Sequence, residues 1–328
     1  MEYSTLFIVG IIVLAYVFDF INGFHDAANS IATIVTTGVL TPKQAVLWAA
    51  FFNFFAFCFF NLMVAKTIGK GIIDPSTIHP NLIFSALIGA ISWNLITWYF
   101  GLPSSSSHAL IGGLAGAGMA HGGFGSLQSA GFIKVAFGIF ITPLLGLAAG
   151  ALIGIILQRC FKNNPEEQLS RWFKYLQLTS SALLSLAHGS NDAQKTMGII
   201  TALLMSASWL EGPFHVPFWV VISCYLMISL GTLFGGWRIV HTMGSCITDL
   251  NVMRGCAAET GAAAVILAST EGGIPVSTTQ TVTGSIAGVG FSNPKGNTHW
   301  RMIKIICLAW LFTIPAAGLV SGGVMLLF

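Results

Sequence analysis

Long apolar stretches separated by short polar connections make up most of the chain. A membrane-spanning helix needs about 20 apolar residues to cross roughly 30 Å of hydrocarbon, at 1.5 Å per residue. Stretches of that length cover residues 5–36, 43–65, 81–101, 131–158, 175–209, 215–237 and 303–328. The pattern therefore predicts an all-α protein that crosses a membrane several times.

Three shorter apolar stretches differ in composition from these spans. Residues 255–271 are rich in small side chains. Residues 104–120 and 276–290 are rich in Gly, Ser and Thr, and each follows a proline. The last two could be thin spans or re-entrant segments, and if all three cross the membrane, each half of the chain has five crossings.

Composition and charge narrow the class of protein. Of the 328 residues, 55% are apolar and 8% are charged, whereas a soluble domain carries about 25% charged residues. This composition excludes a soluble enzyme and a disordered protein. The net charge of +3 provides no basic stripe for nucleic-acid phosphates. The six cysteines lack the spacing of a metal site, and the N-terminus lacks the basic start of a signal peptide.

The most polar connection lies between two apolar halves and suggests an internal duplication. Residues 24–29 of the first half resemble residues 190–195 of the second, and residues 101–108 resemble residues 273–280 in the same order. We therefore predict repeat 1 over residues 1–158, a cytoplasmic connecting loop over residues 159–174 and repeat 2 over residues 175–328.

Two other features of the halves have a simple structural interpretation. The glycine pair Gly112 and Gly116 answers Gly284 and Gly288, and such pairs most simply allow close helix packing. The Phe-rich run over residues 51–57 is most simply a packing or lipid-facing surface.

The distribution of Lys and Arg predicts the orientation, because these residues are enriched in cytoplasmic loops. Five crossings in each half would invert the halves relative to each other and place both termini outside. The cytoplasmic side then carries Lys43, Arg159, Lys162, Arg171, Lys174, Arg238, Arg254, Lys295, Arg301 and Lys304. The outer side carries Lys66, Lys70 and Lys134. If residues 104–120 and 276–290 are re-entrant, each half crosses the membrane four times, and the number of crossings no longer predicts that the halves are inverted.

Two acidic residues stand at equivalent places in the two halves. An ionisable side chain in an apolar segment costs about 2.5–3.5 kcal/mol to insert, so Asp26 and Asp192 are functional candidates. Gly and Asn neighbours, including Asn29 and Asn191, weaken helix continuity. We expect a broken helix at each aspartate, where carboxylates and free carbonyl groups hold small cations near the midplane. The alternative is a structural polar pair that joins the repeats.

Two runs of hydroxyl residues, after Pro103 and Pro275, are candidates for an anion site. Pro is favoured in the first turn of a helix, and Ser and Thr cap its start. The free N–H groups and the positive end of the helix dipole then attract oxyanions. The predicted anion-binding residues are Ser105, Ser106, Ser107, Ser277, Thr278 and Thr279. The alternative is ordinary capping of two membrane segments.

Three further kinds of ionisable residue lie in or beside these motifs. Lys195 follows Asp192 by one helical turn and could neutralise it or contact an anion. Glu259 lies in a helix of small residues without an acidic counterpart in the first half, and could serve a proton relay. Histidines 25, 108 and 188 could titrate near neutral pH. Their spacing differs from the HExxH pattern, so we expect no zinc site.

These motifs resemble the inorganic phosphate transporter (PiT) family. Its G-x-[N/H]-D-x-A-N signature is similar to residues 23–29, and its H-G-x-N-D-x-x-K signature is similar to residues 188–195. Its P-x-S-[S/T]-[S/T]-H runs resemble residues 103–108 and, less completely, residues 275–280. The resemblance covers both halves, and the two aspartate motifs are specific.

The resemblance implies a bacterial secondary symporter with inverted repeats, commonly a homodimer, in the plasma (inner) membrane. It implies alternating access, import of inorganic phosphate with H⁺ or Na⁺, no enzyme activity and no cofactor. Asp26, Asn29, Asp192 and the hydroxyls from Ser105 and Ser277 onward match family positions for cation and phosphate binding. His25 resembles the proton-coupled bacterial branch. Gln280 departs from the family histidine, and the substrate could be free phosphate or a metal–phosphate complex.

The membrane potential constrains any such import. At about 2.3 kcal/mol per charge per 100 mV, a phosphate dianion entering an inside-negative cell costs roughly 4.6 kcal/mol per 100 mV. Two monovalent cations only cancel that cost, whereas a third cation or a monoanionic substrate would make the potential help.

Three alternatives compete with phosphate symport. One is a carrier of sulfate or another tetrahedral oxyanion, and another is a passive anion channel, which would gain nothing from carboxylates. An intramembrane hydrolase using Ser107 and His108 is disfavoured, because adjacent residues on a helix do not face each other.

Overall fold

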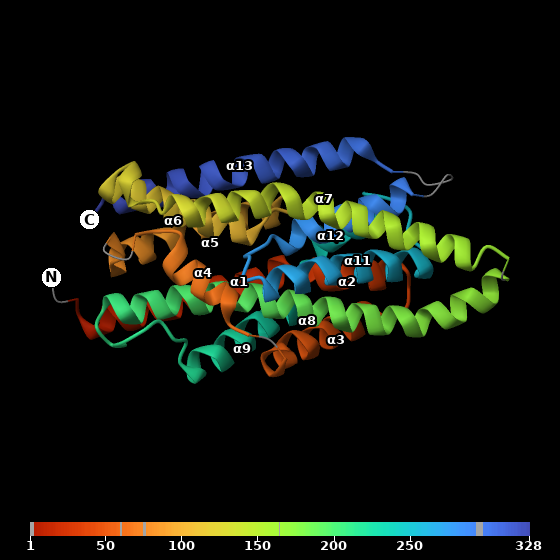
Figure 1. Cartoon of the computed structure of the whole chain (residues 1–328), viewed down its shortest axis with the longest axis horizontal. Coiled ribbons are helices and arrows are strands. Elements are labelled where there is room, and N and C mark those ends of the chain that lie inside the picture. The colour runs from red at the N-terminus through yellow and green to blue at the C-terminus, as the bar shows by residue number, and fades with distance from the viewer. Residues whose placement is uncertain (1–2, 60, 75–76, 164, 293–297) are drawn as a thin grey trace.

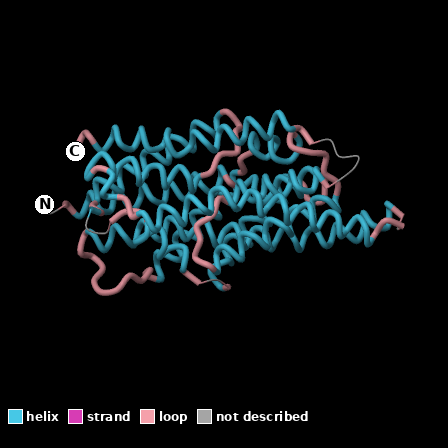
Figure 2. Tube along the Cα trace, turned by 45° about the horizontal axis from the view of Figure 1, so that its top comes forward, coloured by secondary structure: helices cyan, strands magenta, loops and turns pink. Residues whose placement is uncertain are grey.

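The computed structural model describes residues 3–59, 61–74, 77–163, 165–292 and 298–328. Helices connected by loops build these ranges (Figures 1 and 2). The α-helices are α1 Thr5–His25, α2 Ala27–Thr36, α3 Pro42–Phe55, α4 Met63–Gly71, α5 Pro80–Tyr99, α6 Ser106–Gly122, α7 Ser129–Cys160, α8 Glu166–Ser206, α9 Phe218–Phe234, α10 Trp237–Ser245, α11 Val252–Glu271, α12 Thr278–Phe291 and α13 Trp300–Met325. Lys295, counted above for the orientation, lies outside the described residues.

Five helical segments among the described residues are long and apolar enough to cross a membrane. They are Thr5–Thr36, Pro80–Tyr99, Phe140–Cys160, Val252–Glu271 and Trp300–Met325. The pairs α3–α4 and α9–α10 are bent, and each also has the length and hydropathy of a span when its two parts are joined. The prediction of an all-α, multi-pass membrane protein is confirmed.

The connection between the two halves is shorter than the sequence predicted. Helix α7 continues to Cys160 and α8 begins at Glu166, so most of the predicted loop over residues 159–174 is helical. No Gly or Pro lies between residues 166 and 174, and nothing in that segment therefore interrupts the helix. At 32 and 41 residues, α7 and α8 are about 48 and 62 Å long and exceed the hydrocarbon thickness.

The chain breaks at Asp26 but passes through Asp192 without interruption. Asp26 has φ −92° and ψ 3° and separates α1 from α2, whereas α8 is one helix from Glu166 to Ser206. The prediction of a second broken helix is therefore wrong. The Gly at 189 costs about 1 kcal/mol of helix propensity, which the burial of this part of α8 outweighs.

The two short helices α6 and α12 begin with the predicted caps. The hydroxyl of Ser105 accepts from the backbone N–H of His108, and the hydroxyl of Ser277 accepts from that of Gln280, both at 3.2 Å. Capping by these serines is confirmed. The prolines lie two residues before each cap, outside the first turn. Figure 1 shows α6 and α12 running from the middle of the molecule toward opposite ends.

Glycines hold the short helices against two long ones. A Cβ at Gly116 would lie 2.1 Å from the carbonyl oxygen of Gly318, and one at Gly288 would lie 2.0 Å from that of Leu147. Helix α6 therefore packs closely on α13, and α12 on α7. This confirms the prediction that these glycines serve helix packing, and it fixes where the starts of α6 and α12 lie.

Candidate functional site

The starts of α6 and α12 meet the α1–α2 break and the middle of α8 in the interior. Every residue that the sequence predicted for cation or phosphate binding is buried, at no more than 3% exposed. These residues are His25, Asp26, Asn29, Ser105, Ser106, Ser107, Asn191, Asp192, Lys195, Glu259, Ser277, Thr278 and Thr279.

Lys195 connects the acidic motif on α8 with both hydroxyl loops. Its ammonium group donates to Asp192 Oδ1 at 2.5 Å, to the carbonyl oxygen of Val276 at 2.9 Å and to the hydroxyl of Ser107. All three N–H donors are thus used. Lys195 therefore neutralises Asp192, which is one of the two roles that the sequence left open, and it also contacts the start of α6.

Asp26 is held by its chain neighbour and by the start of α6. His25 Nδ1 lies 2.6 Å from Asp26 Oδ1, and the Ser106 hydroxyl lies 2.8 Å from Asp26 Oδ2. The same hydroxyl is 2.6 Å from Asn22 Oδ1. Since a hydroxyl carries one proton, it cannot donate fully to both oxygens. The carboxylate and amide oxygens thus retain acceptor capacity, which suits a small cation.

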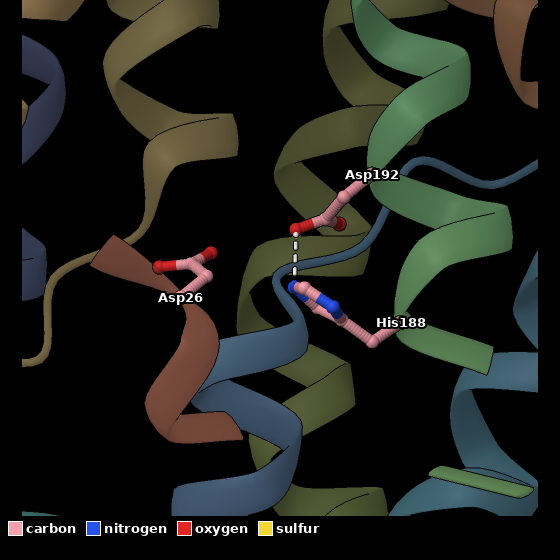
Figure 3. A group of neighbouring side chains, drawn as sticks. All are labelled: Asp26, His188 and Asp192. Atoms are coloured by element: carbon pink, nitrogen blue, oxygen red, sulfur yellow. Dashed lines mark ion pairs between the residues drawn. The ribbon is translucent and has the colours of Figure 1, made fainter. Parts of the chain in front are cut away.

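Asp26, His188 and Asp192 form one buried group (Figure 3). One potential ligand atom from each lies within 4.8 Å of the others, and His188 Nε2 is 3.3 Å from Asp192 Oδ2. Two carboxylates this close repel each other unless a proton or cation lies nearby. The geometry therefore offers a cation site between the break after α1 and the continuous helix α8.

Helix α2 connects this group with the start of α12. The Asn29 amide donates to the hydroxyls of Thr278 and Thr279 at 3.1 and 3.0 Å. Thr278 donates in turn to Asp192 Oδ2 at 3.2 Å. The side-chain amide of Asn191 instead donates to Thr270 Oγ1 of α11 at 2.9 Å. The structure thus joins Asn29 to the candidate anion loop and leaves Asn191 bonded elsewhere.

Glu259 lies in a separate polar cluster between α2, α8 and α11. Its carboxylate accepts from Thr33 at 2.6 Å, from Gln177 at 2.9 Å and from Ser180 at 2.5 Å. Thr33 belongs to α2, the helix that also carries Asn29. The cluster is therefore linked to the main site through α2.

The path from one cluster to the other is short along this helix. Thr33 follows Asp26 by seven residues, which is about two helical turns, and Asn29 lies between them on α2. A displacement of α2 would therefore act on Asp26, Asn29 and the Glu259 cluster together.

A large apolar cavity is lined by residues of α6, α7, α12 and α13, none of them a predicted binding residue. It measures about 650 Å³, and its lining is mostly apolar apart from His108 and Gln280. Neither ring nitrogen of His108 has a hydrogen-bond partner among the described residues. Since no charged residue of the described chain lines this cavity, it does not suit a phosphate ion. The His108 ring makes no hydrogen bond to Ser107, whose hydroxyl bonds instead to Lys195 and to the carbonyl oxygen of Val276, which argues against the Ser107–His108 pair of a hydrolase.

Two buried polar residues, Asn53 and Asp19, were missed in the sequence. Asn53, the polar residue within the Phe-rich run, lies 3.3 Å from His188 Nδ1 and donates to Thr232. Asp19 is buried in α1 and was passed over, although it is an acid within an apolar span. The criterion that selected Asp26 would also have selected Asp19.

Comparisons with known proteins agree on one family. Residues 22–172 and 160–321 match the phosphate transporter family. A protein of Rhizobium meliloti (strain 1021), named a probable low-affinity inorganic phosphate transporter, is 56% identical over 96% of this chain and 94% of its own length. A protein of Bacillus subtilis (strain 168) with the same name is 41% identical over 96% of this chain and 95% of its own. A solved structure of a sodium-dependent phosphate transporter superposes with a TM-score of 0.88 at 25% identity, covering 98% of this chain and 99% of that one.

Proposed function

The chain belongs to the phosphate transporter family, and we propose that it imports inorganic phosphate as a symporter driven by H⁺ or Na⁺. The observation that carries the proposal is the meeting of Asp26 and Asp192 in one buried group beside the starts of α6 and α12. A cation-coupled carrier needs such carboxylates, whereas an anion channel gains nothing from them. Membership of this family makes the protein a transporter rather than an enzyme.

Phosphate binds at the starts of α6 and α12 in this proposal. Ser105 and Ser277 hold the caps, which leaves the first N–H groups of each helix for an anion. These groups belong to Ser106, Ser107, Thr278 and Thr279. The hydroxyls of these residues and the Lys195 ammonium add further donors. Lys195 now donates to Asp192 and Ser106 to Asp26, and an arriving phosphate would accept these hydrogen bonds in place of the two carboxylates.

The coupling cations bind at Asp26 and Asp192, with His25 and Asn29 positioning these groups. Asn191 contributes through its place beside Asp192, and Glu259 serves a proton relay that α2 connects to the site. A site specific for phosphate over sulfate needs an acceptor for the proton of hydrogen phosphate, and either aspartate can provide it. A sulfate carrier lacks that requirement and is the second candidate.

Transport proceeds by alternating access, with two inverted repeats moving against each other around the buried group. The protein works as a homodimer in the plasma (inner) membrane, with both termini outside and the α7–α8 connection in the cytoplasm. Figure 1 shows both termini at one end of the molecule and the α7–α8 connection at the other, which supports placing them on opposite sides of the membrane.

Uptake of labelled phosphate into proteoliposomes tests the proposal. We expect accumulation under an imposed pH or Na⁺ gradient, little competition from excess sulfate, and loss of accumulation in Asp26→Asn and Asp192→Asn. Asp249→Asn is the matched control, since Asp249 is an exposed acid outside the site. Accumulation that survives both site substitutions would remove the aspartates from the coupling mechanism. Flux without accumulation under either gradient would instead indicate a channel.

A further inference from the structure

Asp19 is a third buried acid near the site, and nothing above assigns it a role. It lies on α1 seven residues before Asp26, so the two side chains share a face of the helix about two turns apart. Its side chain is 0% exposed. The Thr196 hydroxyl donates to Asp19 Oδ1 at 2.9 Å, whereas Asp19 Oδ2 has no hydrogen-bond partner among the described residues.

No cationic side chain of the described residues forms an ion pair with this acid. The nearby Lys195 ammonium is fully used by Asp192, Ser107 and Val276. A buried charge without a partner is costly, so an acid in this position needs a proton or a cation.

The groups that face Asp19 come from two neighbouring helices and from its own. Helix α8 contributes Asp192 and Lys195, helix α9 contributes Cys224 and Tyr225, and α1 itself contributes Tyr16. Helix α2 has no titratable side chain, and that of α5, Tyr99, is exposed.

A proton suits this position better than a metal cation. Hard metal cations take about six or more oxygen ligands, and Asp19 offers one unpartnered oxygen. The hydroxyl of Tyr225 is also buried without a partner among the described residues. Both observations indicate a site that takes a proton and no larger ion.

The charge balance gives such a proton a function. Asp19, Asp26 and Asp192 provide three acids against one ammonium, and two cations only cancel the charge of a phosphate dianion. We propose that Asp19 binds and releases one coupling proton, separate from the cations at Asp26 and Asp192, so that each phosphate enters with one additional positive charge. Thr196, next to Lys195 on α8, connects the proton site to the anion site. This inference rests on the proposed cation-coupled import.

The test compares the charge carried per phosphate in wild type and Asp19→Asn proteoliposomes. The potential at which net uptake vanishes, set with K⁺ and valinomycin, reports that charge. We expect Asn at this position to lower it by one elementary charge and to abolish the matching proton uptake. Phosphate exchange across the membrane at equal concentrations should stay within about twofold of wild type, because Asp19 does not contact the anion loops. Asp249→Asn serves as the control, with unchanged charge and exchange.

The possible outcomes of this experiment either support or overturn the role of Asp19. An unchanged charge per phosphate in Asp19→Asn overturns the inference, as does loss of phosphate exchange in folded protein. Asp19→Ser is the second variant, because Ser185 stands at the corresponding place in the second half. If neither neutral variant gives monodisperse protein, Asp19 is a structural acid and the inference fails. Absence of gradient-driven accumulation in the wild type would instead refute the proposed symport itself.

Discussion

The ion pair between Asp192 and Lys195 is the residue-level feature on which the site depends most. Both side chains are at most 1% exposed, and their charged atoms are 2.5 Å apart. Removing one member of a buried ion pair costs about 3–5 kcal/mol, because the other charge stays buried without a partner. The pair therefore has a structural role whatever ion the protein carries.

Lys195→Met should lower the stability of the folded protein by about 3–5 kcal/mol and abolish phosphate uptake. Adding Asp192→Asn should restore most of the stability, since no unpaired charge remains, but should leave uptake absent. Thermal unfolding in detergent measures the stability, and proteoliposome uptake measures the function. A double variant as unstable as the single one would show that the two residues do not act as a pair.

The Ser106 hydroxyl gives a second prediction at this scale. It is shared between Asp26 and Asn22, so Ser106→Ala removes a donor that faces two oxygens. We expect the apparent affinity for the coupling cation to change at least threefold, while Ser106→Thr, which keeps the hydroxyl, stays near wild type. The measurement is uptake rate against cation concentration at saturating phosphate. Equal affinities in all three proteins would place the cation away from this hydroxyl.

Much of the site was predictable residue by residue, and the omissions have one main cause. Asp26 and Asp192 stand out because an acid in an apolar stretch is unusual. Asn53, in contrast, becomes meaningful only when α3 and α8 pack together and bring its side chain within 3.3 Å of His188. A contact between residues 135 positions apart leaves no local signal in the sequence.

At the scale of elements, helix α1 depends on how closely α9 approaches it. A Cβ at Gly23 would lie 2.2 Å from the carbonyl oxygen of Ile228 on α9, a distance that forces the helices apart. Gly10 on the same helix has no neighbouring atom within 4 Å of such a Cβ. Substitutions at these two glycines therefore distinguish the effect of close packing from the effect of helix propensity within one helix.

Gly23→Ala should destabilise the protein by about 1–3 kcal/mol or more, because added volume in a packed contact displaces backbone. Gly10→Ala should be neutral or stabilise it by up to about 1 kcal/mol, since Ala favours the helix. Thermal unfolding of the two variants beside wild type makes the comparison. Equal stabilities for both variants would contradict the close α1–α9 contact.

Helix boundaries were harder to predict than helix positions. Gly and Asn neighbours suggested breaks at both aspartates, yet only Asp26 has one, because residue propensities of about 1 kcal/mol are small beside burial. The polar residues 166–174 similarly suggested a loop, although polar residues form helices readily where no Gly or Pro intervenes. A polar segment indicates exposure to water, and both a loop and a helix that extends beyond the bilayer are exposed to water.

For the whole molecule, the distribution of charge over the two ends predicts the orientation. Arg159 lies in the last turn of α7 and Lys162 in the α7–α8 connection, whereas residues 207–217 between α8 and α9 contain no Lys or Arg. Figure 1 shows the first of these connections at the end opposite to the termini. Because basic loops stay in the cytoplasm, the α7–α8 connection should be internal and residue 211 external.

Cysteines introduced at two exposed positions test this orientation. In a background where Cys58, Cys160, Cys246 and Cys307 are Ser, so that only the buried Cys224 and Cys256 remain, Lys162→Cys should react with a membrane-impermeant maleimide only after the cells are permeabilised. Glu211→Cys, also exposed, should react in intact cells. The pair is internally controlled, because each variant shows that the reagent works on its own side. The opposite labelling result would show that the protein has the opposite orientation in the membrane, with residue 211 in the cytoplasm and the α7–α8 connection outside. Labelling of both cysteines from one side would contradict an α8 that crosses the bilayer, which at about 62 Å it is long enough to do.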